Sequence, residues 1–259
     1  MKKSLIIGIT SDIGTGIKKR LEDDDWQVLG TSSTYQSDSV LKLDLADPKQ
    51  VELFANQLSQ YKDWSLLCLF AGTMEPIGTF FDTDFSSWDK NFRINVLSQL
   101  RILQMLWEYR AKFTEVNVCF LAGGGTNSTF DNYSAYCLSK IALIKFVELI
   151  ASENTEGKFF IIGPGFMKTK IHNQTFRAGK KAGANFKKTE IFMENNGTTL
   201  DKLYQHIKWC IAQPRNAING RNFSTVHDSW ESNTDLSNLL VKDSELFKLR
   251  RVGFHDETI

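Results

Sequence analysis

Cysteine, histidine and proline are scarce in this chain of 259 residues, with four of each. The cysteines lie far apart and form no CxxC or Cys/His cluster, so no zinc or other metal site is expected. A disulfide framework is not indicated either, and buried reduced thiols are the simpler interpretation. We therefore expect a reducing, cytoplasmic compartment.

Charge of one sign and long apolar runs are also lacking. With 31 basic and 30 acidic residues the formal net charge is +1, which gives no electrostatic reason to expect nucleic acid or an anionic membrane as a partner. No run approaches the roughly 18 apolar residues of a membrane span. The short apolar run before Asp12 is not followed by the cleavage site of a secretion signal. Hydrophobic residues make up 42% of the chain, enough for a sizeable core.

Short apolar segments alternate with helical patterns along the chain. Strands are predicted at 4–9, 26–30, 40–43, 65–70, 116–121, 159–162 and 218–224, and helices at 13–23, 48–60, 88–109, 133–152 and 199–212. Continuously apolar strands separated by helices predict a parallel sheet covered on both faces. No linker divides the chain, so we expect one α/β domain of the doubly wound Rossmann type over residues 1–226, followed by a C-terminal extension over 227–259.

A glycine-spaced turn stands at the first strand-to-helix junction. Gly8 and Gly14 permit a tight turn and close approach to a pyrophosphate, and the following helix offers free N–H groups. Asp12 occupies a position where the usual fingerprint has glycine, and a carboxylate is unfavourable beside phosphates unless it points away or caps the helix. The predicted dinucleotide contacts in this turn are Gly8, Thr10, Ser11, Asp12, Ile13 and Gly14.

The end of the second strand bears on the choice of dinucleotide. NAD sites usually carry an acidic residue there to bind the ribose hydroxyls. This chain has Thr31, Ser32 and Ser33 instead, and no acid until Asp38. Hydroxyls and backbone N–H groups can receive a 2′-phosphate, so we predict NADP. No arginine stands beside them, and NAD remains the alternative.

Asp44 and Leu45 follow the third predicted strand. A carboxylate at this point can accept a hydrogen bond from the adenine amino group. Its ordinary role would be to cap the helix that begins at Pro48. The sequence leaves both roles open.

Tyr136 and Lys140 lie four residues apart on a predicted helix, so both side chains face the same side. A free phenol has a pKa of about 10. A nearby cation stabilises the phenolate and lowers that pKa. Such a pair can donate a proton to a carbonyl oxygen as a hydride arrives, or remove one from an alcohol. The spacing alone is common, and most such pairs are structural.

Five motifs in order resemble the short-chain dehydrogenase/reductase family, over roughly residues 4–226. They are the turn from Gly8 to Gly14, Asp44-Leu45, Asn95-Val96-Leu97-Ser98, Tyr136-x-x-x-Lys140 and Pro164-Gly165-Phe166-Met167-Lys168-Thr169. The resemblance implies an NAD(P)-dependent enzyme that interconverts keto and hydroxy groups. It implies that Tyr136 is the general acid/base, that Lys140 holds the nicotinamide ribose and lowers the Tyr136 pKa, and that Asn95 fixes a water in a proton relay.

The same resemblance implies further cofactor contacts and an assembly. Thr169 would contact the diphosphate, and the backbone near Met167 the carboxamide. The remaining expected contacts are Ala71, Gly72, Pro164 and Gly165. Family members assemble as homodimers or homotetramers through helices that correspond here to about 88–109 and 133–152.

One departure from the family pattern concerns the substrate. The family usually has a serine 13 or 14 residues before the tyrosine, where this chain has Gly123 and Ala122. The hydroxyl of Thr126 or Ser128 could replace it, or the backbone N–H groups from Gly123 through Gly124 to residue 125 could bind a carbonyl oxygen. Alternatively, the protein binds a dinucleotide as a catalytically idle sensor or scaffold.

The segment from about 168 to 198 corresponds to the family's substrate flap. Between 168 and 188 it has seven basic residues and no acidic one. This predicts an anionic small-molecule substrate, a sugar or nucleotide sugar contacted by Lys180 and Lys181. A solvated loop is the alternative interpretation. The glycine run and the chain's ending also resemble family members encoded with bacterial surface-polysaccharide genes. A carbonyl reductase for acyl or other small ketones is the second enzyme hypothesis.

Overall fold

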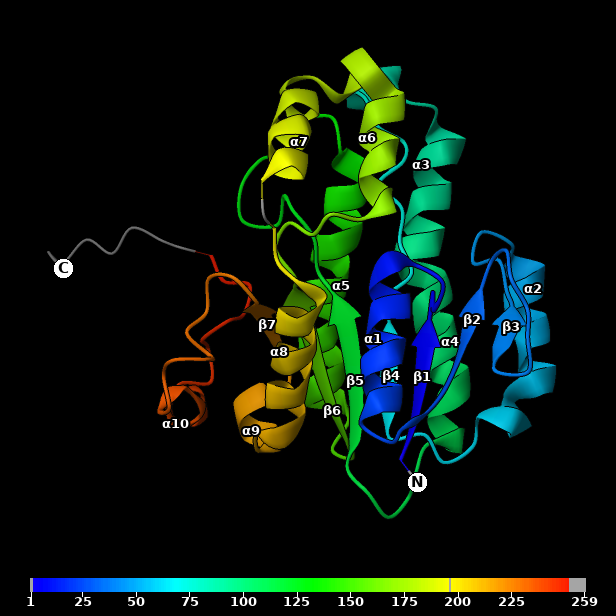
Figure 1. The fold of residues 1–259 in the computed structure, drawn as a ribbon, viewed down its shortest axis with the longest axis vertical. Helices are drawn as coiled ribbons and strands as arrows, with labels where there is room; N and C mark the ends of the chain where they lie inside the picture. The colour runs from blue at the N-terminus through cyan, green and yellow to red at the C-terminus, as the bar shows by residue number, and fades with distance from the viewer. Residues whose placement is uncertain (1, 196, 252–259) are drawn as a thin grey trace, which may run out of the picture.

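A seven-stranded, entirely parallel sheet forms the centre of the computed structural model, which describes residues 2–195 and 197–251. The strand order is β3-β2-β1-β4-β5-β6-β7. Their bounds are β1 (Lys3–Ile7), β2 (Gln27–Ser32), β3 (Val40–Lys42), β4 (Leu66–Leu69), β5 (Val116–Leu121), β6 (Gly157–Gly163) and β7 (Arg221–Ser224). Helices cover both faces (Figure 1), which confirms the predicted single doubly wound domain.

The helices form two layers. Their bounds are α1 (Asp12–Asp23), α2 (Pro48–Leu53), α3 (Phe85–Phe92), α4 (Ser98–Leu106), α5 (Ser134–Glu153), α6 (Asn173–Ala178), α7 (Ala184–Glu194), α8 (Leu200–Ala212), α9 (Arg215–Ile218) and α10 (Leu236–Lys242). Alternate strand residues point to opposite faces. Leu5 and Val118 therefore pack with α2, α4 and α5, while Ile6 and Cys119 pack with α1, α8, α9 and α10.

The long helix predicted at 88–109 is divided in the structure. Between α3 and α4 lies a π-helical turn, η3 (Arg93–Leu97), which contains Asn95. A π turn frees backbone carbonyls from the regular ladder. The buried amide of Gln99 donates to the carbonyls of Ile94 and Asn95, and also to that of Ala71 at the end of β4. One side chain thus stabilises the turn and fixes it against the edge of the sheet.

Two further predicted elements differ at their ends. The helix that starts at Pro48 continues beyond α2 as a 3-10 helix, η1 (Phe54–Tyr61). The strand predicted from Ile218 begins only at Arg221, because the preceding residues form α9. The flap residue 196 and the extension residues 252–259 lie outside the described residues.

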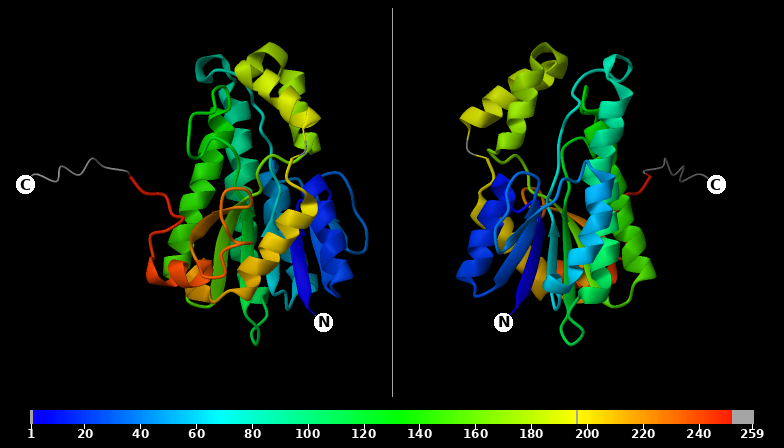
Figure 2. Two further views of the ribbon diagram at one scale, coloured as in Figure 1. Left: turned by 60° about the vertical axis from the view of Figure 1, so that its left-hand side comes forward. Right: turned by 90° about the vertical axis from the view of Figure 1, so that its right-hand side faces the viewer.

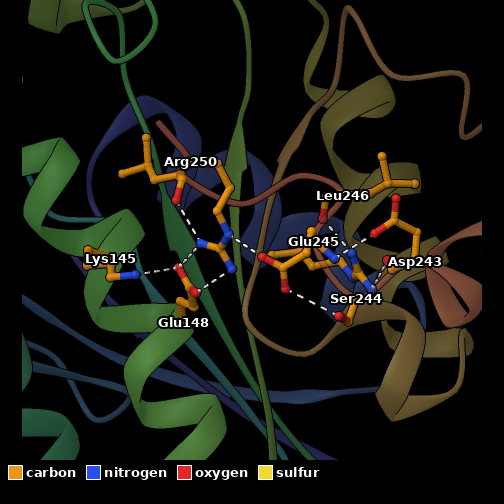
Figure 3. A network of polar contacts seen from close by, with 9 residues as sticks. Lys145, Glu148, Asp243, Ser244, Glu245, Leu246 and Arg250 are labelled. Atoms are coloured by element: carbon orange, nitrogen blue, oxygen red, sulfur yellow. Dashed lines mark hydrogen bonds and ion pairs between the residues drawn. The ribbon is translucent and has the colours of Figure 1, made fainter. Parts of the chain in front are cut away.

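The C-terminal extension packs against β7 and α5 (Figure 3). The buried guanidinium of Arg221 donates to the carbonyls of Leu240, Asp243 and Leu246. Arg250 pairs with Glu148 on α5, at 2.8 Å between Nη2 and Oε1. These contacts cover the outer edge of β7, which would otherwise be an unpaired strand edge.

Across residues 2–195 and 197–251, the structure has no helix that combines the length and the apolar composition needed to cross a membrane. In the same residues, no group of three or more His, Cys, Asp or Glu side chains lies close enough together to hold a metal ion. The four cysteines are free thiols, and only Cys137 among them is partly exposed.

Candidate active site

The predicted catalytic residues converge at the carboxyl edge of the sheet. Tyr136 and Lys140 lie in the first two turns of α5, which starts after the loop that follows β5. Gly72 follows β4 and lies beside both Asn95 and Lys140. A Cβ placed on Gly72 would be 3.5 Å from Asn95 Oδ1 and 3.8 Å from Lys140 Nζ. The structure therefore brings the segment after β4, the π turn and α5 together, as a doubly wound site requires.

Tyr136 lies directly against Gly123. A Cβ on Gly123 would be only 2.1 Å from Tyr136 Oη, so the hydroxyl occupies the space that any side chain at residue 123 would need. Tyr136 is 9% exposed, and burial raises the pKa of its phenol, with Cys137 adding to the effect. At neutral pH the phenol is therefore protonated and can act as a proton donor.

Lys140 is oriented differently from the sequence-based expectation. Its Nζ donates to the carbonyl of Leu121 at 2.9 Å and lies 5.8 Å from the centre of the Tyr136 ring. Burial lowers the pKa of Lys140 to about 8. Burial is the main cause of the raised Tyr136 pKa in the chain alone, and the Lys140 ammonium group donates to a backbone carbonyl. The lowering of the Tyr136 pKa by Lys140 stays a prediction.

Lys140→Met is expected to remove activity but to stabilise the fold at pH 7. A pKa lowered from 10.5 to about 8 by burial costs about 3 kcal/mol while the lysine is charged in both states. The unfolded chain keeps its proton between pH 8 and 10.5, so the stability of the parent rises with pH in that range. Urea unfolding at pH 7 and pH 10 should show a variant that is more stable at pH 7 by about 1–3 kcal/mol, with a smaller difference at pH 10. A less stable variant at pH 7 would contradict this electrostatic cost.

Asn95 is fully buried and forms a network of hydrogen bonds. Its Nδ2 donates to the carbonyl of Thr73 at 2.9 Å and to Ser139 Oγ at 2.9 Å, and its Oδ1 accepts from the Thr73 N–H at 2.9 Å. Ser139 Oγ donates in turn to the carbonyl of Tyr136. Asn95 therefore connects the segment after β4 to the turn of α5 that carries the tyrosine. Sequence reasoning missed Ser139 and Thr73, which no motif identifies.

The turn after β1 has the shape that a dinucleotide phosphate site requires. Gly8 has a φ of +88°, and a Cβ on it would be 2.9 Å from the backbone of Ala71. A Cβ on Gly14 would be 2.3 Å from the Gly8 carbonyl oxygen. Ser11 caps α1 by accepting from the Gly14 N–H at 3.0 Å, and this helix has the 12 residues needed for a substantial dipole. The residues present fit NAD(P), with Asp12 as the one unfavourable charge.

Asp12 points away from the turn toward the flap. Its Oδ2 accepts from the backbone N–H of Lys170 at 2.5 Å, and its Oδ1 lies 3.5 Å from Lys170 Nζ. Asp12, Met167 and Thr169 also line a cavity of about 570 Å³ between the start of α1 and the start of α8. Asp12, at a position where the family usually has glycine, thus connects the phosphate-binding turn to Lys170, the first residue of the 3-10 helix η5 (Lys170–His172).

Asp12→Asn is expected to tighten NADPH binding by about threefold to tenfold. The amide keeps an acceptor for the Lys170 N–H but removes a negative charge from the start of the helix, where the diphosphate is expected. Fluorescence titration of NADPH measures the Kd. Asp201→Asn makes the same change in the first turn of α8 and is the control. Unchanged or weaker binding in Asp12→Asn alone would show that the carboxylate does not oppose the cofactor.

The three predicted hydroxyl side chains at the end of β2 differ in burial and in hydrogen bonding. Thr31 and Ser32 are buried, and Ser32 Oγ lies 2.7 Å from Thr10 Oγ1 while accepting from backbone N–H groups of its own turn. Only Ser33 of the three predicted residues is exposed. Lys42 pairs with Ser32 in the parallel register and is exposed, a cation that sequence reasoning missed. The sequence could have indicated Lys42, because it lies in the predicted third strand, two residues before Asp44.

Asp44 does not cap α2. Its Oδ1 accepts from the Ala46 N–H at 2.9 Å, whereas Asp47 caps the helix by accepting from the Lys49 N–H at 2.9 Å. The alternative role considered for Asp44 is therefore wrong. Leu45 is buried, and its carbonyl accepts from Ser98 Oγ at 2.7 Å, which ties the Asp44-Leu45 motif to α4.

The segment after β6 leads from the sheet into the flap. Gly165 has a φ of +75°, and a Cβ there would be 2.4 Å from Val226. Met167 is buried, and its carbonyl accepts from Thr169 Oγ1 at 3.4 Å. Pro164 and Gly165 therefore place Met167 and Thr169 at the carboxyl edge, beside the start of α1, where the resemblance puts the cofactor.

The flap is helical, and several of its apolar residues pack toward Tyr136. It consists of η5, α6, η6 (Gly179–Ala182) and α7, which stand above the carboxyl edge of the sheet (Figures 1 and 2). Ala182 is fully buried in a cluster with Tyr136, Tyr133 and Met74. Ile77 completes the buried part, and Phe130, Cys137, Ile171, Ala178 and Phe186 pack against it.

Two predicted substrate contacts, Lys180 and Lys181, lie on the solvent-exposed part of the flap. Lys180 and Lys181 are exposed, while Ala182 next to them packs into the tyrosine cluster. The structure therefore does not bring Lys180 and Lys181 to the tyrosine as substrate contacts, and the solvated-surface interpretation fits them. The helical pattern was missed because the inward residues are small or polar, and they give no strong apolar periodicity.

Polar contacts hold the flap against the segment after β4. Gln174 Oε1 accepts from the Met74 N–H at 2.6 Å and from Thr73 Oγ1 at 3.3 Å. Thr175 Oγ1 lies 2.8 Å from Tyr133 Oη, within the buried cluster. The flap is thus closed over Tyr136. These partners come from distant parts of the chain, so the sequence contained no signal for them.

Comparison with known proteins agrees with this geometry. A family model described as enoyl-(acyl carrier protein) reductase matches residues 11–223. The chain therefore belongs to the short-chain dehydrogenase/reductase family, whose members are NAD(P)-dependent oxidoreductases.

Among individual proteins, an uncharacterized oxidoreductase of Saccharomyces cerevisiae is 30% identical over 99 residues, which are 38% of this chain and 39% of that protein. A benzil reductase ((S)-benzoin forming) of the same yeast is 27% identical over 193 residues, covering 66% of this chain and 73% of the relative. The crystal structure of a yeast short-chain dehydrogenase/reductase has a TM-score of 0.73 at 21% identity, covering 89% of this chain and 98% of the other. An uncharacterized oxidoreductase of Schizosaccharomyces pombe is 30% identical over 101 residues, so the chain spans only 39% of the length of the first yeast relative and 40% of this one.

Proposed function

We propose that the protein is an NADPH-dependent carbonyl reductase for apolar ketones, particularly ketones that carry aromatic rings. The observation that supports it most is the closed flap, whose inner side adds apolar residues around Tyr136 while its lysines face solvent. The benzil reductase relative is described as acting on a substrate of this kind. It narrows the second enzyme hypothesis from the sequence, a carbonyl reductase for acyl or other small ketones.

The proposed chemistry uses residues that the structure brings together. When bound, the reduced nicotinamide supplies a hydride to the carbonyl carbon. Tyr136 holds a proton at Oη and transfers it to the carbonyl oxygen, so that the C=O double bond becomes an alcohol and the phenolate regains a proton from water. Lys140 would hold the nicotinamide ribose and stabilise the transient phenolate. Asn95 would keep the water path beside Ser139 in place.

A sugar or nucleotide-sugar substrate is less well supported than it was from the sequence. That prediction depended on the basic flap residues, and Lys180 and Lys181 are solvent-exposed and absent from the buried cluster around Tyr136. Arg177 lies 3.1 Å from Glu75, which neutralises a third flap cation. A role in polysaccharide synthesis gains no support from the relatives described above.

Steady-state turnover of the purified chain with NADPH tests this function. Benzil, an aliphatic ketone and a nucleotide-linked keto sugar form the substrate panel. We expect kcat/KM for benzil to exceed that for the keto sugar by at least about tenfold. A preference for the nucleotide sugar would overturn the substrate class. No turnover of any ketone, with NADPH bound, would favour the idle dinucleotide-binding protein.

The NADPH preference is proposed on the exposed Ser33, the lack of an acid after β2 and the position of Lys42. Lys42→Ala is expected to raise the KM for NADPH about tenfold and to leave the KM for NADH within about twofold, because one cation near a 2′-phosphate contributes about 1.4 kcal/mol. Lys49→Ala, another exposed lysine, is the control. Equal effects on both cofactors would remove Lys42 from 2′-phosphate recognition.

A homodimer or homotetramer that uses α4 and α5 stays part of the proposal. Ile102 and Ile144 on these helices are buried in the protein's own core and are not available for assembly. Leu138 and Leu149 on α5 are 49% exposed and could form the contact. Light scattering after size exclusion would determine the mass in solution, and a monomer at micromolar concentration would contradict the assembly.

A further inference from the structure

The site lacks the serine hydroxyl that orients the substrate in the family, and the structure shows why a side chain cannot stand there. Tyr136 Oη occupies the position of a Cβ on Gly123, at 2.1 Å from it. The preceding Ala122 still belongs to the sheet edge, since its N–H donates to the Ile162 carbonyl at 2.9 Å. The polar group that binds the substrate oxygen must therefore come from another part of the loop.

The Tyr136 hydroxyl itself points to where that group lies. Tyr136 is 9% exposed, and no hydrogen-bond partner of Oη occurs among residues 2–195 and 197–251. Oη is not one of the fully buried unpaired atoms of these residues, so it reaches the accessible surface of the site and is free to bind a ligand there. A Cβ on Gly123 would be 2.1 Å from Oη, so Oη lies beside the backbone of Gly123, which carries the first N–H group of the glycine turn.

The backbone N–H groups of this turn are donors without a recorded protein acceptor. The ladder of β5 ends with the Ala122 N–H, and no bond from the N–H of Gly123, Gly124 or Gly125 occurs within the part of the chain that the structure describes. Gly125 has a φ of +81°, a left-handed conformation that turns the chain over Cys137. Successive N–H groups in such a turn form a concave site for an electronegative oxygen.

The side-chain hydroxyls considered from the sequence are less suitable. Thr126 is half-buried, Ser128 is exposed, and neither forms a hydrogen bond with Tyr136. We propose that the N–H groups of the Gly123–Gly125 turn, together with Tyr136 Oη, bind the substrate's carbonyl oxygen in place of the family's serine. This inference rests on the proposed carbonyl reductase function. The donors stabilise the negative charge that develops on the oxygen before the proton of Tyr136 reaches it.

Two substitutions at Gly124 test the donors. A Cβ at this residue would meet nothing closer than Phe130 at 4.0 Å, so alanine fits and keeps the N–H, whereas proline removes it. With benzil and NADPH, kcat of Gly124→Pro is expected to be at least about 100-fold below that of Gly124→Ala. The Kd for NADPH should agree between the two variants within about twofold.

Thr126→Val and a spectroscopic measurement distinguish the outcomes. Equal kcat in the two Gly124 variants, or a comparable loss in Thr126→Val, would overturn the inference. If Gly124→Pro does not fold, NMR spectra of the parent labelled with ¹⁵N-glycine test the same donors. On adding NADP⁺ and benzoin, the amide protons of this turn should shift downfield, and unmoved signals would overturn it. Failure of the parent to reduce any ketone would instead refute the proposed function itself.

Discussion

Gly123→Ser is expected to lower kcat/KM for ketone reduction by about 100-fold or more, although it restores the residue that the family usually has. The reason is steric: the new Cβ would lie 2.1 Å from Tyr136 Oη, so the phenol must leave its position over the glycine turn. Loss of a well-placed general acid typically costs two to four orders of magnitude in rate. Steady-state kinetics with benzil and NADPH measure the effect.

Gly163→Ser provides a matched control for this steric argument. A Cβ on Gly163 would make ordinary contacts, at 3.5 Å to a Phe223 oxygen and 3.9 Å to Ala122, so the same substitution close by should leave kcat/KM nearly unchanged. Both variants should bind NADPH like the parent. Parental or higher activity in Gly123→Ser would mean that the tyrosine does not work from its observed position.

Tyr136→Phe is expected to reduce kcat by about 10²- to 10⁴-fold while the Kd for NADPH remains within about twofold of the parent. The phenylalanine ring fills the same apolar cluster, so the lost group is the proton at Oη. Tyr61→Phe removes a buried phenol from a different core cluster and should leave kcat unchanged. Retention of activity in Tyr136→Phe would refute the proposed mechanism.

The pH profile gives an independent measurement on the same pair. Because burial raises the Tyr136 pKa, the phenol stays protonated at neutral pH and should not cause a decrease in the reduction rate there. Lys140 loses its charge as the pH rises through about 8. If the ammonium stabilises the transient phenolate, the rate should fall on the alkaline side of that value. A rate that stays constant to pH 10 would show that the charge on Lys140 is not needed.

The strands and the residues at their ends were predictable because they depend on local information. An apolar run followed by glycine or a polar residue marks the carboxyl end of a parallel strand, and such ends meet at one edge of the sheet. This is why Gly8, Gly72 and Gly165 could be placed at one site from the sequence. The four-residue spacing of Tyr136 and Lys140 likewise needs only a regular helix.

The missed features depend on contacts between distant segments. Gln99 stabilises the π turn through carbonyls of its own helix and of the segment after β4. Gln174 holds the flap through N–H groups a hundred residues away. Ala182 is fully buried beside the exposed Lys180 and Lys181. A motif cannot encode such relations, so the substrate role of the basic flap residues stays a prediction.

The position of Cys137 makes its reaction with an alkylating reagent a measure of flap opening. Its sulfur lies 3.8 Å from the Gly124 carbonyl, beside the turn that Tyr136 faces, while the other three cysteines are buried. Burial raises the pKa of this thiol to about 11, so alkylation at neutral pH should be slow in the closed form. The rate of Cys137 labelling would then report the rate of flap opening in the native sequence, with no engineered cysteine.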